Sequence, residues 1–202
     1  MTRQLPIIFC PEMVKVAYEG RKNMTRRIEG LKVLNEHPDE WTFTGWIEQG
    51  LAQFERKNNE VIQIKPRYRV GDECWIKERW ASGRKYDNRP PRLIPVDREI
   101  WFPDEVRWNF DSRKGKARSS RFMCKWMARC WLRITKVNDP HQIQTIREED
   151  CIAEGIVPNE RESYTDGFHN LWNRLHPKPG ERWEDNPWVF CYEFEMIEGK
   201  PQ

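Results

Sequence analysis

The sequence predicts an α+β fold, in which several short strands combine with three short helices as a small barrel or a strongly bent sheet. Three stretches carry apolar residues at helical spacing together with helix start and stop signals. Four other apolar stretches alternate or run continuously as strands do, at residues 5–10, 68–80, 129–139 and 186–198. The 202 residues show no internal repeat, so we expect one domain, residues 1–202, with long loop insertions at about 31–66 and 82–115.

The first half of the chain begins with a predicted strand and a predicted helix. "LPIIFC", residues 5–10, is typical of a short buried strand, and Pro11 can then occupy the first turn of a helix. Apolar residues recur at helical spacing until Gly20, which supplies the helix stop. Residues 31–66 are weakly patterned and hold a predicted hairpin ("WTFTGWIEQG", then "VIQIK"). "YRVGDECWIKERW", residues 68–80, then alternates as a strand does.

The second half opens with an irregular segment. Residues 82–121 are rich in Pro, Arg and Trp without a clear period, which indicates an insertion or lid. "RCWLRITKVND" is the clearest strand. "TIREEDCIAEG" predicts a helix that Thr145 caps, with Glu148 completing a capping box and Gly155 ending it. "DGFHNLWNRLHP" predicts another helix, and "NPWVFCYEFEMIE" predicts a final strand.

Charge is spread unevenly along a chain whose net charge is only +3. Residues 1–30 carry +3 and residues 82–121 carry +5, whereas residues 141–202 carry −7. Eleven tryptophans exceed ordinary usage, and aromatic faces interleaved with Arg and Lys are what base stacking requires. Two interpretations stay open: a polyanion partner approached from one side, or interleaved charges that solvate long loops.

Several classes of protein are disfavoured. No apolar run approaches the ~20 residues that span a bilayer, and the N-terminus lacks the long apolar region of a signal peptide. We therefore expect a cytoplasmic protein without a membrane partner. The six cysteines and four histidines are scattered without metal-site spacing, so reduced, buried cysteines are expected. No phosphate-binding glycine loop, GxSxG or HExxH motif occurs, and we expect neither cofactor nor metal.

The stretch "GRKNMTRR", residues 20–27, is the main candidate for chemistry. It follows a helix stop, so it lies in a loop or a strand with several backbone groups free. In an extended segment Lys22 and Arg26 share one face, and Thr25 and Arg27 share the other. A turn would instead bring Lys22 and Thr25 together. Because like charge disfavours an ammonium, a lysine among other cations loses its proton more easily, and Lys22 is a candidate base.

Two glutamates are the other candidates. Glu154 is the last residue before Gly155, at the predicted C-terminus of a helix, where a carboxylate opposes the helix dipole at a cost of about 0.3–1 kcal/mol. A structural role would favour Lys or Arg at that position. Glu78 lies on the more apolar face of its predicted strand and needs a partner if it is buried. It either joins a ligand pocket or, as we favour, forms an ion pair with Arg27 or Arg79.

These stretches resemble the ASCH domain family of the PUA-like superfamily. "GRKNMTRR" is similar to the family motif G-x-K-x-x-E-x-R, and closest to a phage and prophage branch of that family. "YRVGDECWIKERW", "SSRFMCKWMARCWLRIT", "IREEDCIAEGI" and "NPWVF" are similar to further segments of that branch. Together these blocks cover most of the chain except residues 31–66 and 82–115.

The resemblance implies a small β-barrel with flanking helices and a cleft that accepts a nucleotide base. Some small ASCH proteins remove the acetyl group from N4-acetylcytidine with a Lys, a Thr and a Glu, which fall on Lys22, Thr25 and Glu154. The implied mechanism has Lys22 activate water, Thr25 orient it or stabilise the tetrahedral species, and Glu154 handle the proton of the leaving amine. Arg27 fits a phosphate or an oxyanion, and Arg21 and Arg26 are further substrate-binding candidates.

The chain departs from the family pattern at several positions. Thr25 stands where the general motif has Glu, which favours the amidohydrolase-like variant. Asn23 replaces a usual Thr, and Cys124 replaces the Pro of the phage branch. The chain is also much longer than the small hydrolases, so its insertions can reshape or cover the pocket.

Two functions follow from the sequence. One is a hydrolase acting on a modified pyrimidine nucleoside or base, such as an N4-acylcytidine. The alternative is a non-catalytic module, or a ribonuclease, that binds RNA or modified DNA, with Trp101 and Trp108 of the basic insertion stacking on bases. The partner is a modified nucleoside or a nucleic acid in both cases, in the bacterial host cytoplasm if the protein is phage-encoded, and the oligomeric state stays open.

Overall fold

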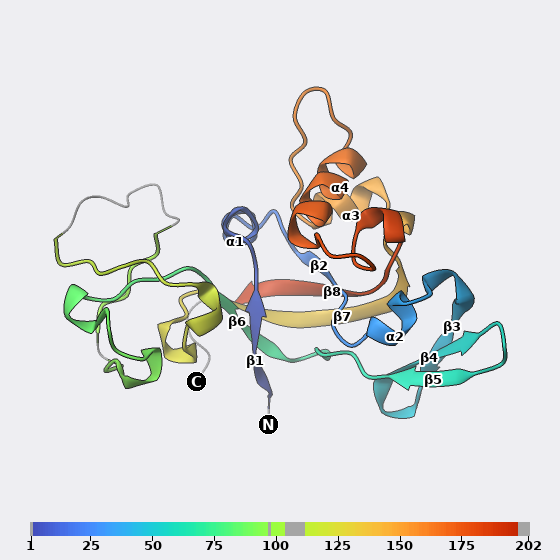
Figure 1. Cartoon of the computed structure of the whole chain (residues 1–202), viewed down its shortest axis with the longest axis horizontal. Coiled ribbons are helices and arrows are strands. Elements are labelled where there is room, and N and C mark those ends of the chain that lie inside the picture. The colour runs from blue at the N-terminus through green and yellow to red at the C-terminus, as the bar shows by residue number, and fades with distance from the viewer. Residues whose placement is uncertain (1, 97, 104–111, 198–202) are drawn as a thin grey trace. The chain divides into compact units, whose positions relative to one another are not determined.

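The computed structural model describes residues 2–96, 98–103 and 112–197 (Figure 1). The α-helices of these residues are α1 (Pro11–Tyr18), α2 (Lys32–Asn35), α3 (Glu148–Ala153) and α4 (Tyr164–Leu175). The strands are β1 (Gln4–Ile8), β2 (Met24–Arg27), β3 (Trp41–Ile47), β4 (Leu51–Arg56), β5 (Val61–Ile64), β6 (Glu73–Lys77), β7 (Trp131–Gln142) and β8 (Trp188–Ile197). Sheets accompanied by a few short helices confirm the predicted α+β class.

The chain divides into two compact units, and each is assembled from segments far apart in sequence. Unit one comprises Met1–Gly20, Asp72–Arg133 and Met196–Gln202. Unit two comprises Arg21–Gly71 and Ile134–Glu195. The single domain expected from the sequence stays a prediction.

Unit one is organised around β6. This strand pairs in parallel with β1 and antiparallel with the first residues of β7. Because β6 is central, its residues Glu73 to Ile76 are all buried, as is usual for a strand covered on both sides. A hydrophobic cluster of this unit consists of Trp75, Trp80, Tyr86, Ile94, Met123, Met127, Ala128 and Trp131.

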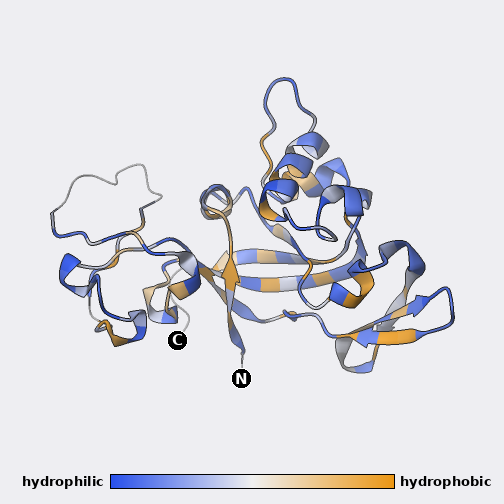
Figure 2. Ribbon diagram, in the orientation of Figure 1, coloured by the Kyte–Doolittle hydropathy of each residue, from blue (hydrophilic) through white to orange (hydrophobic). Residues whose placement is uncertain are grey.

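Unit two is built on the strand order β7–β8–β2, and side chains of β8 alternate between its two faces. Figure 2 shows the alternating hydropathy along β7 and β8. Val189 belongs to the cluster under α3 and α4, which also contains Ile143, Ile146, Cys151, Ile156, Phe168 and Trp172. On the opposite face, the Trp188 ring meets Phe54 at 5.2 Å and the Phe190 ring meets Trp46 at 6.4 Å. The meander β3–β4–β5 therefore covers the second face.

The predicted helix start at Thr145 is wrong. The Thr145 hydroxyl donates to the carbonyl of Gln142 at 2.8 Å, within a 3-10 turn, so it is not available to cap a helix. Helix α3 begins only after Arg147. Its predicted end is confirmed, since Gly155 follows the last turn with a φ of +81°, a conformation that favours glycine.

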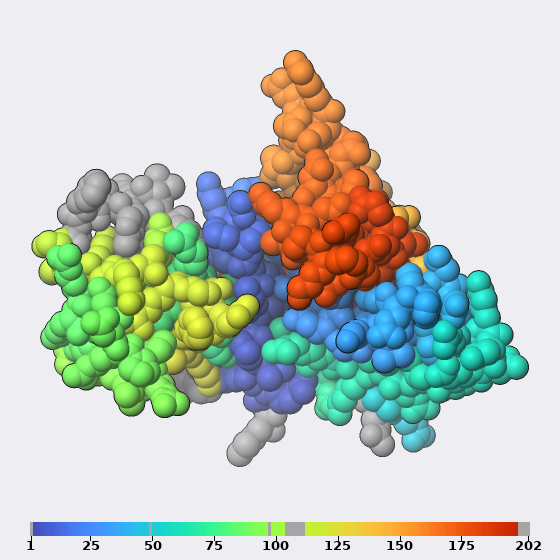
Figure 3. Space-filling view, viewed as in Figure 1, coloured from blue at the N-terminus to red at the C-terminus, as the bar shows by residue number. Residues whose placement is uncertain are grey.

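The two predicted insertions have different structures. Residues 31–66 contain α2 and a three-stranded antiparallel meander, where a hairpin was predicted. The described part of residues 82–115 is irregular, as predicted, with 3-10 turns and isolated bridges. The described strand pairings form open sheets, so the closure of a barrel stays a prediction. In Figure 3 the segment between α3 and α4 protrudes from the rest of unit two.

Within the described ranges, every helix is too short or too polar to cross a membrane.

Candidate functional site

Lys22 and Glu154, 132 positions apart, are in direct contact within unit two. The Lys22 ammonium donates to the Glu154 carboxylate, and also to the Glu154 backbone carbonyl at 2.9 Å. Backbone hydrogen bonds fix this arrangement, because the Asn23 amide donates to Ala153 at the end of α3 at 2.9 Å. The Asn23 carbonyl accepts from Phe194 of β8 at 2.8 Å. The side chains of Lys22 and Glu154 are only 2% and 6% exposed.

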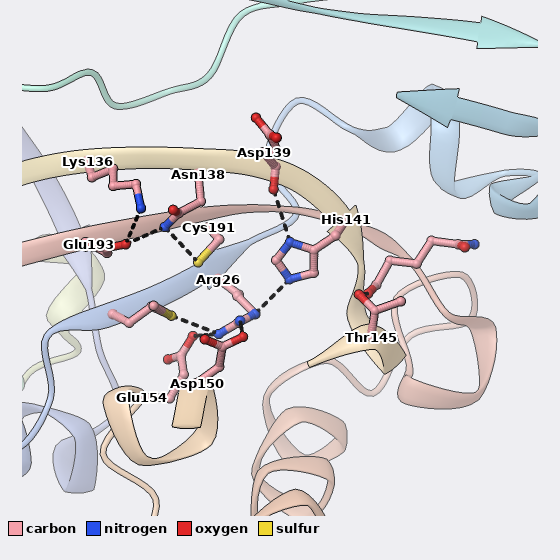
Figure 4. Close-up of polar contacts among 12 residues, drawn as sticks. Arg26, Lys136, Asn138, Asp139, His141, Thr145, Asp150, Glu154, Cys191 and Glu193 are labelled. Atoms are coloured by element: carbon pink, nitrogen blue, oxygen red, sulfur yellow. Dashed lines mark hydrogen bonds and ion pairs between the residues drawn. The ribbon is translucent and has the colours of Figure 1, made fainter. Parts of the chain in front are cut away.

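Arg26 lies at the centre of the same polar network (Figure 4). Its guanidinium donates to Glu154 Oε1 at 3.1 Å and to Asp150 Oδ2 at 2.8 Å. Its Nε donates to His141 Nε2 at 3.0 Å. Burial acts to lower the pKa of Arg26, but the charges of Glu154 and Asp150 outweigh it, so the pKa is raised. Arg26 is therefore a permanent buried cation.

His141 is neutral in this arrangement. Its Nε2 accepts from Arg26, and its Nδ1 lies 3.1 Å from the Asp139 carbonyl, so the proton is on Nδ1. Burial, and then the positive charge of Arg26, lowers the pKa of His141. The imidazole therefore fixes the orientation of the Arg26 guanidinium without adding a second positive charge.

Two local periodicities produce the network. Lys22 lies two residues before β2 and Arg26 lies on it, and both side chains reach Glu154, so they share one face as the sequence predicted for an extended segment. On α3, Asp150 and Glu154 are four residues apart and share one helix face. Each oxygen of the Glu154 carboxylate serves a different cation: Oε1 contacts Arg26 and Oε2 contacts Lys22. Two cations and two carboxylates thus balance.

Thr25 and Arg27 lie on the other face of β2. In the antiparallel register Thr25 is opposite Tyr192 and Arg27 is opposite Phe190, whereas Arg26 is opposite Cys191. Paired residues share a face, so the side chain of Thr25 points away from that of Arg26. Thr25 is 4% exposed.

Three further residues were predicted at the site: Arg21, Trp101 and Trp108. Arg21 is exposed immediately before Lys22. Trp101 belongs to unit one, where its backbone pairs with Ala81. Trp108 falls outside the described residues.

The predicted partner of Glu78 is wrong. Glu78 is buried in unit one and pairs with Arg129, rather than with Arg27 or Arg79. Arg129 Nε donates to Oε1 at 3.1 Å and Nη2 to Oε2 at 2.7 Å, a two-bond geometry that favours this pair. The Arg129 guanidinium also lies 3.9 Å from the centroid of the Phe102 ring. The ion-pair interpretation of Glu78 was therefore sound, but its partner was not visible in the sequence.

Sequence reasoning missed Asp150 and His141. Asp150 could have been found, because it lies one helical turn before Glu154. His141 gave no signal, since it follows Pro140 near the end of a long strand and has no local motif. In residues 2–96, 98–103 and 112–197, no group of three or more His, Cys, Asp or Glu is placed to hold a metal ion.

No protein-family model matches the sequence, and no curated protein matches it. The fold is similar to the solved structure of an ASCH domain from Lactobacillus crispatus JV V101, at 10% identity and a TM-score of 0.44, over 96% of this chain and 79% of that chain. It is also similar to protein EF3133 from Enterococcus faecalis V583, a DUF984 protein, at 10% identity and a TM-score of 0.43, over 100% of this chain and 84% of that chain. An ASCH domain is thus among the structural neighbours of a chain whose motifs resemble that family, and the phage branch stays a prediction. Because both TM-scores are below 0.5, the site is interpreted from this chain's own residues.

Proposed function

We propose that the Lys22–Glu154 pair of unit two hydrolyses an amide on a modified pyrimidine nucleoside or base, of the N4-acylcytidine type. The observation that carries this proposal is the contact between the two residues, which the sequence marked separately as a candidate base and a candidate acid. The resemblance of residues 20–27 to the ASCH motif supports the choice of an acylated cytosine as the substrate class.

The proposed reaction needs one proton transfer within the pair. The Lys22 ammonium passes its proton to Glu154, and the neutral amine then takes a proton from water. The hydroxide formed adds to the acyl carbon, the C–N bond breaks, and Glu154 returns its proton to the leaving N4 nitrogen. The products are a carboxylic acid and the free cytosine amine, and the pair ends as it began. Arg26 keeps Glu154 in position through Oε1, which leaves Oε2 facing Lys22.

Access to the pair is a specific requirement of the proposal. Lys22 and Glu154 are almost fully covered, whereas the side chain of Asp150 is 32% exposed. The substrate therefore approaches from the Asp150 side and displaces the side chains that cover the pair. The role of Thr25 in orienting water or stabilising the tetrahedral species stays a prediction from the sequence, because strand alternation directs its side chain away from that of Arg26.

The first test is a chromatographic assay of the purified protein with N4-acetylcytidine and other acylated cytidines. Lys22→Met and Glu154→Gln are expected to lose turnover, and Thr25→Val reports on the hydroxyl. Matched controls are Lys32→Met and Glu149→Gln, which remove the same charges from exposed positions of unit two. Circular dichroism at the assay temperature establishes that each variant is folded. Full turnover in folded Lys22→Met would refute the proposal.

Binding without hydrolysis is the second candidate function. The near-complete burial of Lys22 and Glu154 favours it, because a fully paired network can hold one face of a base site in place without reacting. In that case no acylated cytidine turns over, and calorimetry detects binding of the same nucleosides to the parent protein. A parent protein that neither binds nor hydrolyses them would eliminate both functions.

A further inference from the structure

A second feature of the molecule lies in unit one and is independent of the Lys22–Glu154 pair. Two segments at the two ends of the predicted irregular region, residues 80–92 and 113–121, run side by side. The bridges Trp80↔Arg118 and Gly83↔Lys114 join them in antiparallel fashion. Further backbone hydrogen bonds reinforce this pairing, from Arg84 to Arg113 at 2.9 Å and from Gly115 to Ser82 at 2.8 Å. Two basic stretches are thereby placed next to each other.

The paired segments present a set of exposed cations. These are Arg84, Lys85, Arg89, Arg92 and Lys116. In the described residues, none of these five side chains forms an ion pair with a carboxylate. The nearby Asp87 carboxylate accepts a hydrogen bond from the backbone amide of Lys116. Five exposed cations around one described carboxylate, Asp87, leave these paired segments with a positive charge, so an anionic partner would be attracted to them.

The cations are attached to a rigid base. Tyr86 is buried in the Trp75–Trp131 hydrophobic cluster of unit one, and its ring lies 5.2 Å from Lys85 Nζ and 5.7 Å from the Arg89 guanidinium. Arg118 lies 5.0 Å from the centroid of the buried Trp80 ring and donates to the Arg89 carbonyl at 2.8 Å. Because these contacts fix the backbone, the spacing of the charges is set before any partner binds.

We propose that residues 84–92 and 113–121 of unit one form a binding surface for the phosphodiester backbone of a nucleic acid. Arginine forks match phosphate oxygens, and a row of fixed cations matches the regular charge of a strand. Phe122, 60% exposed directly after this surface, offers a face on which an unpaired base can stack. An anionic membrane fits less well, since basic membrane-surface segments are typically amphipathic helices and these residues form only three-residue 3-10 turns.

The test is fluorescence anisotropy with labelled single-stranded RNA, single-stranded DNA and duplex DNA of one sequence. The test variant is Arg84→Gln/Arg89→Gln/Lys116→Gln. Its matched control is Lys32→Gln/Lys57→Gln/Lys178→Gln, which removes three exposed charges from unit two. Each lost phosphate contact reduces the slope of log affinity against log salt by about 0.9 for duplex DNA and about 0.7 for single strands, so the test variant should lose roughly 2–3 units of slope. We expect at least about a tenfold loss of affinity at ~0.1 M salt for the test variant, with the control close to the parent.

Several outcomes would overturn the proposal. They are equal losses of affinity in both triple variants, an affinity that does not change with salt concentration, or no binding to any of the three nucleic acids. Vesicles of phosphatidylcholine with phosphatidylserine serve as a fourth ligand, and binding to these vesicles alone would also overturn the proposal. Comparing the affinities for single-stranded RNA, single-stranded DNA and duplex DNA identifies which nucleic acid the surface prefers. The result is separate from the proposed hydrolase, because salt-dependent binding is measured without turnover and the test variant keeps both Lys22 and Glu154.

Discussion

Removing the charge of Glu154 should destabilise the fold strongly. Glu154→Gln keeps the size of the side chain but leaves Lys22 and Arg26 with one carboxylate, Asp150, instead of two. The side chains of Glu154, Lys22 and Arg26 are between 1% and 6% exposed, so water cannot replace the lost contact. Breaking a buried ion pair by removing one partner costs about 3–5 kcal/mol.

This cost converts into a large shift of the thermal midpoint. For a chain of this size 1 kcal/mol corresponds to about 2–4 °C, so Glu154→Gln should lower the midpoint by roughly 6–20 °C. The assay is thermal unfolding followed by circular dichroism and tryptophan fluorescence. Glu149→Gln, an exposed position on the same helix, should change the free energy of unfolding by less than about 0.5 kcal/mol.

A double-variant cycle identifies the source of the loss. If Lys22 is the main group left unpaired, Lys22→Met/Glu154→Gln should be more stable than the sum of the single changes implies, by about 1–3 kcal/mol. Equal midpoints for Glu154→Gln and Glu149→Gln would refute the reasoning, because they would show that the network contributes no more than a surface charge.

Three further predictions concern other sites. Burial lowers the pKa of His176 to about 4, from an ordinary value near 6.5, so the folded state binds this proton less readily than the unfolded state. The free energy of unfolding should therefore keep the full contribution of His176 above pH ~6.5 and fall by about 2–3 kcal/mol towards pH ~4. Urea titrations at several pH values should show a smaller fall in His176→Gln. Arg129→Ala removes both hydrogen bonds from Arg129 to the buried Glu78 and should cost about 1–3 kcal/mol. Arg129→Lys should rescue only part of this loss, because lysine cannot form the two-bond geometry; chemical unfolding of the three proteins checks this order. In Gly115→Ala the new Cβ lies 2.8 Å from the Ser82 carbonyl, so the paired basic segments must separate and nucleic-acid affinity should fall several-fold; parent-like binding would show that their pairing is irrelevant.

The sequence predicted local features well because they depend on nearby residues. The end of α3 just before Glu154 follows from Gly155 alone, and the shared face of Lys22 and Arg26 follows from strand alternation. Periodicity indicates which face a side chain occupies, but not what lies opposite it. The predicted partner of Glu78 is therefore wrong, since the actual partner, Arg129, is 51 positions away in the sequence and only the fold brings it near.

The same limit applies to Lys22. Lys22 was predicted to be a base because other cations lie near it in the sequence, yet the structure places the Glu154 carboxylate against its ammonium. Long-range pairing supplies this group, and no local pattern around residues 20–27 could have named it. The hydroxyl of Thr145 shows a different limit, because a residue suited to capping a helix instead bonds to a preceding turn.

The discontinuous make-up of unit two has a consequence for synthesis on the ribosome. Arg26 emerges early, but its two carboxylate partners lie 124 and 128 positions downstream. At about 5–20 residues per second, the nascent chain waits roughly 6–25 s before this cation can be neutralised. Strand β2 likewise has no pairing partner until β8 is made. The meander β3–β4–β5 can pair as soon as it is made, whereas β2 and its buried cations stay unpaired and accessible to chaperones for most of translation.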